Sequence, residues 1–130
     1  MKKTISLSFL ATIVLLFTGC GQPVQTPLYT WGNYVNSSTD YGMRGHEKEV
    51  AEKHLAELEK IIIASESNKQ RVAPGIYAEY AQILFESNEK VKAKEYFLLE
   101  KKTYIESTQF IDRVLLKLYG EEKWKSIFLY

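Results

Sequence analysis

The sequence contains one cysteine and only two histidines and three prolines among its 130 residues. A single cysteine, Cys20, allows neither an internal disulfide nor a cysteine-based metal cluster. No Cys, Asp or His accompanies His54 at the spacing of a metal motif, so we predict no metal and no cofactor. The sequence also lacks a glycine-rich phosphate loop, a nucleophile elbow and an identifiable pair of glycosidase carboxylates. We therefore expect a protein that is not an enzyme.

The sequence also carries no large excess of positive or negative charge. Lys and Arg together number 17 and Asp and Glu 16, which gives a formal net charge of +1. Nucleic-acid binding requires a basic patch, and the sequence predicts none. Five glutamates gather in one stretch and are interpreted as the solvated face of a helix: Glu47, Glu49, Glu52, Glu57 and Glu59.

Long hydrophobic runs are also missing. The apolar run at residues 5–17 follows Lys2 and Lys3 and is shorter than the roughly 20 residues that span a bilayer. A positive start and a short apolar middle are typical of a secretory signal. A membrane anchor or a buried helix is the alternative. We expect the signal to cover residues 1–19.

The end of that run is a more specific pattern. Leu16-Phe17-Thr18-Gly19-Cys20 resembles the lipobox of bacterial lipoproteins, although Phe17 stands where that pattern usually has Leu. The resemblance implies cleavage before Cys20 and acylation of its sulfur. Acyl chains attach a protein firmly to a membrane when more than one is present. By the usual sorting rule, Gly21 implies the outer membrane, with the protein facing the periplasm. Display on the cell surface is the alternative.

 We interpret residues 20–27 as a short lipidated tether that precedes a single domain at residues 28–130.

Aromatic residues are plentiful where the domain begins. Tyr29, Trp31, Tyr34 and Tyr41 lie within thirteen positions, and nearby glycines are expected to interrupt any long regular element. Two interpretations stay open for these rings. In the first, the rings bind a partner or a sugar ring, because Tyr and Trp are favoured at binding surfaces. In the second, the rings pack onto the helices that follow.

Hydrophobic periodicity predicts helices over the rest of the domain. The stretch 47–65 lacks Gly and Pro and carries an apolar stripe, with His54 beside that stripe. Pro74 is expected in the first turn of a second helix, and Asn88 in a left-handed turn after it. Ser107 is expected to cap a further helix and Gly120 to end it.

The helix that begins near Pro74 and a following helix after Asn88, whose apolar stripe includes Ala93 and Phe97, together resemble a tetratricopeptide repeat. The resemblance rests on the positions Tyr77, Tyr80, Ala81, Leu84, Ala93 and Phe97. It implies that Ala81 and Ala93 let two antiparallel helices approach closely and that Phe97 fills the gap to the next helix. Glu100 and Ile105 depart from the pattern. We predict an all-α domain of about four helices built from tetratricopeptide-like hairpins.

A second resemblance covers residues 28 to about 118. Leu28-Tyr29-Thr30-Trp31-Gly32-Asn33-Tyr34 and Val72-Ala73-Pro74-Gly75-Ile76-Tyr77-Ala78 look like motifs of a small bacterial lipoprotein family known only as a domain of unknown function. The resemblance implies a periplasm-facing lipoprotein encoded beside a lipoprotein that resembles the curli secretion channel. It implies no activity and no functional residues.

We therefore expect a helical adaptor, anchored through Cys20, that helps to assemble an envelope lipoprotein complex. The candidate contact residues are Trp31, Tyr34, Tyr77, Tyr80 and Tyr104, although core packing explains each of them equally well. The alternative is a lipoprotein that binds peptidoglycan or another ligand. A third alternative is self-association through the apolar residues near the C-terminus, which are Trp124, Ile127, Phe128, Leu129 and Tyr130.

Overall fold

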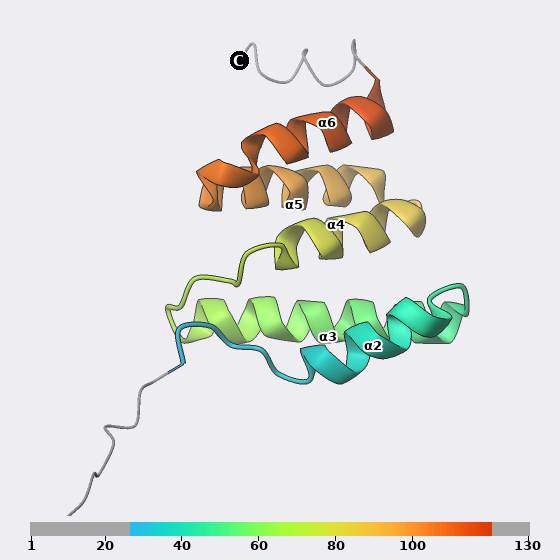
Figure 1. The fold of residues 1–130 in the computed structure, drawn as a ribbon, viewed down its shortest axis with the longest axis vertical. Helices are drawn as coiled ribbons and strands as arrows, with labels where there is room; N and C mark the ends of the chain where they lie inside the picture. The colour runs from blue at the N-terminus through green and yellow to red at the C-terminus, as the bar shows by residue number, and fades with distance from the viewer. Residues whose placement is uncertain (1–26, 121–130) are drawn as a thin grey trace, which may run out of the picture.

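The computed structural model describes residues 27–120, and all regular structure within them is helical. The helices follow one another with short connections and stack along the long axis of the molecule (Figure 1). Their bounds are α2 (Tyr34–Arg44), α3 (Lys48–Ser67), α4 (Ile76–Glu86), α5 (Lys90–Thr103), the 3₁₀ turn η1 (Ile105–Ser107) and α6 (Thr108–Tyr119). The all-α prediction is confirmed, with one helix more than the four expected.

The additional helix is α2, which pairs with α3. We expected glycines to interrupt this region, and that prediction is wrong for Gly42, which lies inside the helix. A Cβ atom at Gly42 would meet nothing within 4 Å, so the residue lies on an open surface. A glycine in a helix interior costs only about 1 kcal/mol, and contacts with α3 and α4 offset that cost. Helix α2 contributes no buried residue of its own.

The long helix α3 confirms the helix predicted at 47–65, and it extends to Ser67. Val50, His54, Leu58, Ile61 and Ile62 are buried along one side of it. The helix ends where Lys69 adopts a left-handed backbone with φ 54°, and the N–H of Gln70 reaches back to the carbonyl of Ser65 at 2.9 Å.

Helices α4 and α5 form the antiparallel hairpin that the repeat-like pattern predicts. Asn88 takes the expected left-handed conformation between them, with φ 69°. Ala81 and Ala93 are fully buried. Phe97 lies in a core cluster with Ala81 of α4 and with Ile111 and Leu115 of α6, so it fills the space between the hairpin and the next helix.

The start of α4 differs from the prediction. Pro74 lies before the helix, and Gly75 is the N-cap residue with φ 89°. Gly75 has no side chain that could accept from the exposed N–H groups at the start of α4. Instead the buried carboxylate of Glu100, on α5, accepts a hydrogen bond from the N–H of Gly75 at 2.9 Å. The residue that departs from the repeat pattern therefore stabilises the junction between the two helices.

Ser107 is the N-cap residue of α6, as predicted, but the capping hydrogen bond expected from its side chain is absent. Ser107 closes the 3₁₀ turn η1 and already has a helical backbone, so its hydroxyl makes no capping hydrogen bond to α6. That hydroxyl donates to Oε1 of Glu100 at 3.3 Å instead. Gly120 ends α6 as predicted, with φ 76°.

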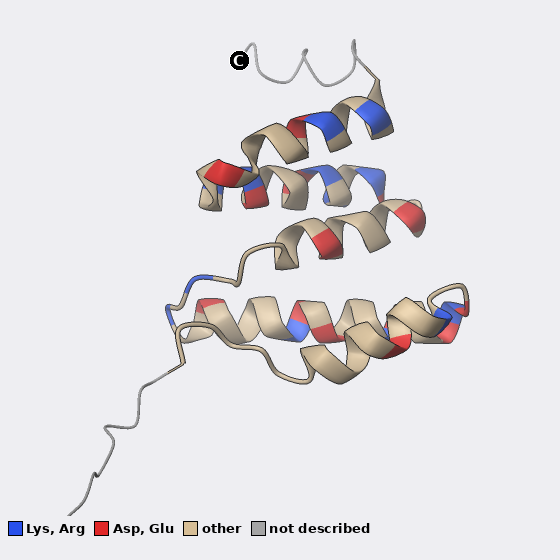
Figure 2. Ribbon diagram, in the orientation of Figure 1, with Lys and Arg blue, Asp and Glu red and all other residues tan. Residues whose placement is uncertain are grey.

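Positive and negative side chains alternate over α3, α5 and α6 (Figure 2). Several of them pair along one helix, as Lys53 and Glu49 do at 2.7 Å. Within residues 27–120, no helix combines the length and the apolar character needed to cross a bilayer.

Candidate functional site

The five residues predicted to contact a partner have different positions in the fold. Tyr77, Tyr80 and Tyr104 are buried, with exposed fractions of 7%, 1% and 3%. Trp31 is 45% exposed, and Tyr34 is half-buried. Burial thus removes three of the five from the accessible surface. The predicted acylation site, Cys20, lies outside the described residues.

The buried tyrosines connect helices. The hydroxyl of Tyr80 donates to Glu59 of α3 at 3.2 Å and accepts from Lys92 of α5 at 3.1 Å. The hydroxyl of Tyr77 donates to Glu66 of α3 at 3.3 Å. Burial, together with the nearby Glu66 carboxylate, raises the pKa of Tyr77 to about 12. These contacts are those of a core.

The Trp-Gly motif forms a tight turn ahead of α2. The N–H of Tyr34 donates to the carbonyl of Trp31 at 2.9 Å, and Gly32 has φ 48°. A Cβ atom at Gly32 would lie 2.7 Å from Oε1 of Glu57. The same oxygen accepts the N–H of Asn33 at 2.7 Å. Glycine is required because the backbone is left-handed and approaches α3 closely.

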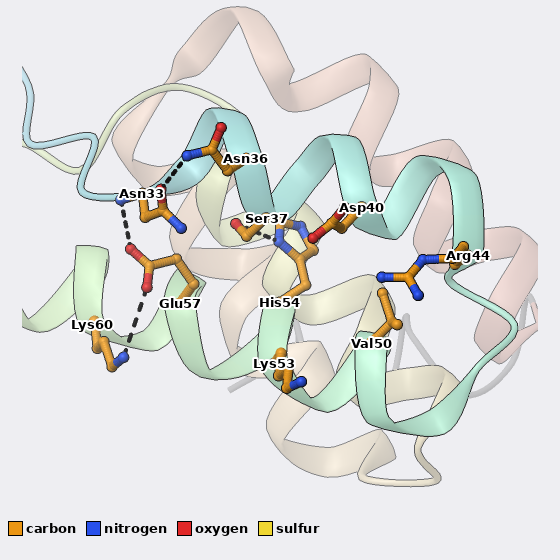
Figure 3. Close-up of a pocket in the computed structure, with 10 residues that line it drawn as sticks. All are labelled: Asn33, Asn36, Ser37, Asp40, Arg44, Val50, Lys53, His54, Glu57 and Lys60. Carbon is orange, nitrogen blue, oxygen red and sulfur yellow. Dashed lines mark hydrogen bonds and ion pairs between the residues drawn. The ribbon is translucent and has the colours of Figure 1, made fainter.

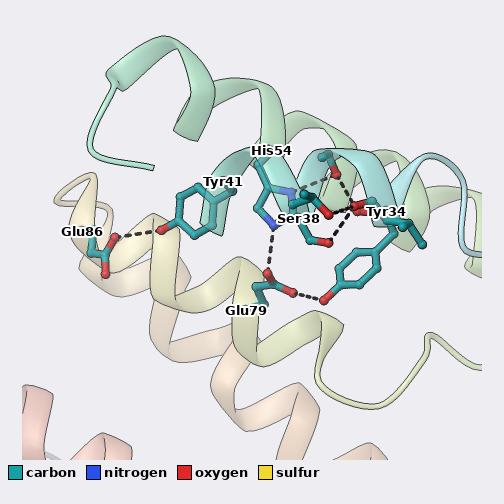
Figure 4. Close-up of polar contacts among 9 residues, drawn as sticks. Tyr34, Ser38, Tyr41, His54, Glu79 and Glu86 are labelled. Carbon is teal, nitrogen blue, oxygen red and sulfur yellow. Dashed lines mark hydrogen bonds and ion pairs between the residues drawn. The ribbon is translucent and has the colours of Figure 1, made fainter. Parts of the chain in front are cut away.

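A cluster of polar side chains joins α2, α3 and α4, and we call it the His54 cluster: Tyr34, Ser37, Tyr41, His54 and Glu79. His54 is 1% exposed. Its Nδ1 lies 3.0 Å from the Ser37 hydroxyl, and its Nε2 lies 2.9 Å from Oε1 of Glu79. Figure 4 shows Tyr34 and Tyr41 on opposite sides of His54. The Tyr41 ring stacks on the imidazole with centroids 4.9 Å apart.

Glu79 is the acceptor at the centre of this cluster, because the Tyr34 hydroxyl donates to its Oε2 at 2.8 Å. Burial by itself raises the pKa of Glu79, but the hydrogen bonds from His54 and Tyr34 outweigh burial and lower that pKa below 4.5. Burial and the Glu79 carboxylate raise the pKa of Tyr34 to about 12. The cluster therefore holds an ionised carboxylate among neutral hydroxyl donors and a histidine.

A polar pocket of about 280 Å³ opens between α2 and α3, beside the His54 cluster (Figure 3). Asp40 and Arg44 line it from α2, and Lys53 and Glu57 line it from α3. Its cations already have carboxylate partners, because Lys53 pairs with Glu49 and Lys60 with Glu57. The mixed charges of this pocket favour no single class of ligand. Residues 27–120 contain no group of three His, Cys, Asp or Glu side chains placed to hold a metal ion.

An apolar groove of about 340 Å³ lies on the other side of the same cluster. The groove lies between α4 and α6. The C-terminal ends of these two helices meet, and there Phe85 of α4 and Tyr119 of α6 pack edge to face with ring centroids 5.4 Å apart. Phe97 of α5 lines the groove between them. Phe110 of α6 is 61% exposed. We call this surface the apolar groove, and its lining is Tyr41, Gly75, Ala78, Glu79, Gln82, Ile83, Phe97, Phe110 and Val114.

Most polar side-chain atoms that line the apolar groove already have partners within the chain. Both oxygens of Glu79 accept hydrogen bonds in the His54 cluster. The hydroxyl of Tyr41 donates to Oε2 of Glu86 at 3.3 Å, and Nε2 of Gln82 donates to Oε1 of Glu86 at 2.7 Å. The groove therefore offers mostly apolar surface to an occupant.

The family model for the domain of unknown function DUF4810 matches residues 28–114. The chain belongs to this family. The DUF4810 match begins just before the Trp-Gly turn and ends within α6, so it includes the His54 cluster and the lining of the apolar groove. No curated protein and no solved structure is similar enough to match the chain.

Two features of this DUF4810 domain were not predicted from the sequence. His54 was placed beside an apolar stripe, but nothing in its local sequence indicated Glu79, which lies 25 positions later on another helix. The second feature is the exposure of Phe110 on α6. A stripe that includes Phe110, Ile111, Val114, Leu115 and Leu118 is wider than one neighbouring helix covers, and that width was the available signal for an exposed apolar face.

Proposed function

We propose that this protein is a membrane-anchored helical adaptor that holds a partner of the bacterial envelope in its apolar groove. The observation that carries the proposal is the 61% exposure of Phe110 in an apolar groove where the side chains of Tyr41 and Glu79 already have hydrogen-bond partners within the chain. Contiguous apolar surface of this kind is typical of a protein interaction site. Helical hairpin modules use such surfaces to hold peptides and helices.

The predicted acylation of Cys20 complements the groove. Acyl chains confine the protein to the membrane surface, and a partner anchored in the same membrane is then present at a high effective concentration. A groove of modest affinity suffices under that condition. The resemblance to a lipoprotein family supports the outer membrane as the location, with the domain facing the periplasm, and a curli-secretion-channel-like lipoprotein as the partner.

The anchor and the groove are tested separately. A palmitate analogue should label the wild-type protein and not a Cys20→Ser variant. For the groove, the tagged protein is purified from solubilised membranes at native expression, as wild type and as the Phe110→Ala and Ile105→Ala variants. Ile105 is the control because it is 82% exposed and does not line the groove.

We expect the channel-like lipoprotein to co-purify with the wild type and with Ile105→Ala, and to be depleted with Phe110→Ala. Recovery of the wild-type protein alone would contradict the adaptor function. Equal recovery with both variants would place the contact elsewhere on the surface.

A second candidate function rests on Trp31. This ring is 45% exposed and packs against Tyr29 and Tyr34, with centroid distances of 6.2 and 5.6 Å. An exposed, supported indole suits stacking on a sugar ring. Under this alternative the protein sediments with purified peptidoglycan, and a Trp31→Ala variant does not. Failure of the wild type to sediment would exclude this alternative and leave the adaptor proposal unchanged.

A further inference from the structure

We propose that the occupant of the apolar groove is an amphipathic α-helix of a partner protein, with a Lys or Arg beside its apolar face at the C-terminal end of α4. This inference rests on the proposed function, because it specifies the partner segment that the groove receives.

The first argument concerns hydrogen bonds. An extended peptide brings unpaired backbone N–H and C=O groups into a groove, and burying them without partners is costly. The groove offers few partners, because Tyr41, Glu79 and the amide nitrogen of Gln82 are already bonded within the chain. The N–H of Gly75 is also bonded, to Glu100. A helix pairs its own backbone N–H and C=O groups, so it loses no backbone hydrogen bonds when it enters such a site.

The second argument concerns dimensions. Helix α4 has 11 residues, which corresponds to about 16 Å at 1.5 Å per residue. A partner helix of about three turns matches this length and presents apolar side chains at positions i, i+3 or i+4, and i+7. Gly75 and Ala78 line the groove with little side-chain volume, while Phe97, Phe110 and Val114 supply apolar contacts.

The third argument concerns charge. None of the nine lining residues is Lys or Arg, and Glu79 is among them. Glu86 lies beside the groove and is exposed, and among the described residues 27–120 its oxygens accept hydrogen bonds from the neutral groups of Tyr41 and Gln82. Glu86 is also the last residue of α4, where the helix dipole adds partial negative charge. Lys90 of α5 also lies near this end, with Nζ 5.5 Å from the centroid of the Phe85 ring. A partner cation is therefore favoured beside Tyr41 and Gln82, where the Glu86 carboxylate lies.

The experiment uses the full-length protein in its native membrane. A photo-crosslinking phenylalanine analogue replaces Phe110, and the same analogue replaces Ile105 as the control. Mass spectrometry maps the segment that is captured. We expect position 110, and not position 105, to capture one segment with apolar residues at helical spacing and a Lys or Arg. A peptide of that segment is then tested for binding, with and without a proline at its centre.

A helical segment should lose at least about tenfold in affinity with the central proline, because proline removes a backbone hydrogen bond and clashes with the preceding turn of the helix. Glu86→Lys should weaken binding of the peptide by about twofold to fivefold, as expected for an exposed ion pair. Glu95→Lys is the matched control, since Glu95 is an exposed glutamate of α5 outside the groove lining. Thermal melting of both variants establishes that they are folded.

Four outcomes would overturn the inference: no capture at position 110, capture of residues 121–130 of the same chain, an acidic segment, or a segment that tolerates the central proline. The last two would leave the adaptor function standing, because a partner would still occupy the groove. The proposed function itself fails only if the co-purification described above also recovers no partner.

Discussion

Replacing His54 with alanine should release α2 from the rest of the domain. Helix α2 has no fully buried residue, so its attachment depends on the contacts of half-buried side chains, of which Tyr34 and Tyr41 pack against the core. His54 supplies the central ones, through Ser37 and Glu79 and through the ring of Tyr41. The free energy needed to open α2 should therefore fall sharply in the variant.

The expected size follows from these contacts. A hydrogen bond contributes about 1 kcal/mol net, and up to about 3 kcal/mol when one partner is charged, as Glu79 is. Ring stacking on Tyr41 adds about 1 kcal/mol. Allowing for partial rehydration of Ser37 and Glu79, we expect the opening of α2 to become easier by about 3 kcal/mol. That change corresponds to roughly 100-fold faster exchange at about 1.4 kcal/mol per factor of ten.

Amide hydrogen exchange, followed by mass spectrometry on the chain from residue 20 with Cys20→Ser, measures this effect segment by segment. The α2 amides should exchange faster in His54→Ala, and those of the α4–α5 hairpin should change much less. His46→Ala is the control, because His46 is exposed and lies before α3. Equal acceleration in α2 and in the hairpin, or unchanged exchange in α2, would refute the view that the His54 cluster holds this helix.

Three further changes test other parts of the fold. The pKa of Glu79 in the folded protein lies below 4.5, so its ionised carboxylate stabilises the fold above that pH, and this contribution is lost on acidification. Urea unfolding between pH 6 and about pH 3 should therefore show a steeper fall in the free energy of unfolding for the wild type than for Glu79→Gln. Gly75→Ala should cost about 1–2 kcal/mol by chemical denaturation, entirely from its φ of 89°, because a Cβ there meets no atom within 4 Å. Phe97→Ala should cost about 3–5 kcal/mol, and a loss below about 1 kcal/mol would mean that α6 does not depend on this ring.

Local signals in the sequence were sufficient for most of the helices. Periodicity located α3, and Asn88 and Gly120 marked a turn and a helix end whose left-handed backbones the structure contains. Ala81, Ala93 and Phe97 predicted the packing of the hairpin and its contact with α6. Each of these signals depends on residues close together in the chain or on a repeated spacing, which is why they could be recognised without the structure.

The features that were missed depend on contacts between distant residues. Gly42 argued against a helix at α2, and only the approach of α3 and α4 supplies the contacts that stabilise one. The 3₁₀ turn before α6 changed the role of the Ser107 hydroxyl from a capping acceptor to a donor for Glu100. The pairing of His54 with Glu79 and the exposure of Phe110 follow from how the helices are arranged, and no short motif encodes that arrangement.

The absence of buried residues in α2 has a consequence for how DUF4810 sequences diverge. A helix that packs against the core only through Tyr34 and Tyr41 is free to change most of its other side chains without disturbing the packing beneath it. Selection should then act on the three positions that contact His54 or Glu79, which are Tyr34, Ser37 and Tyr41, while the intervening residues vary from one family member to the next.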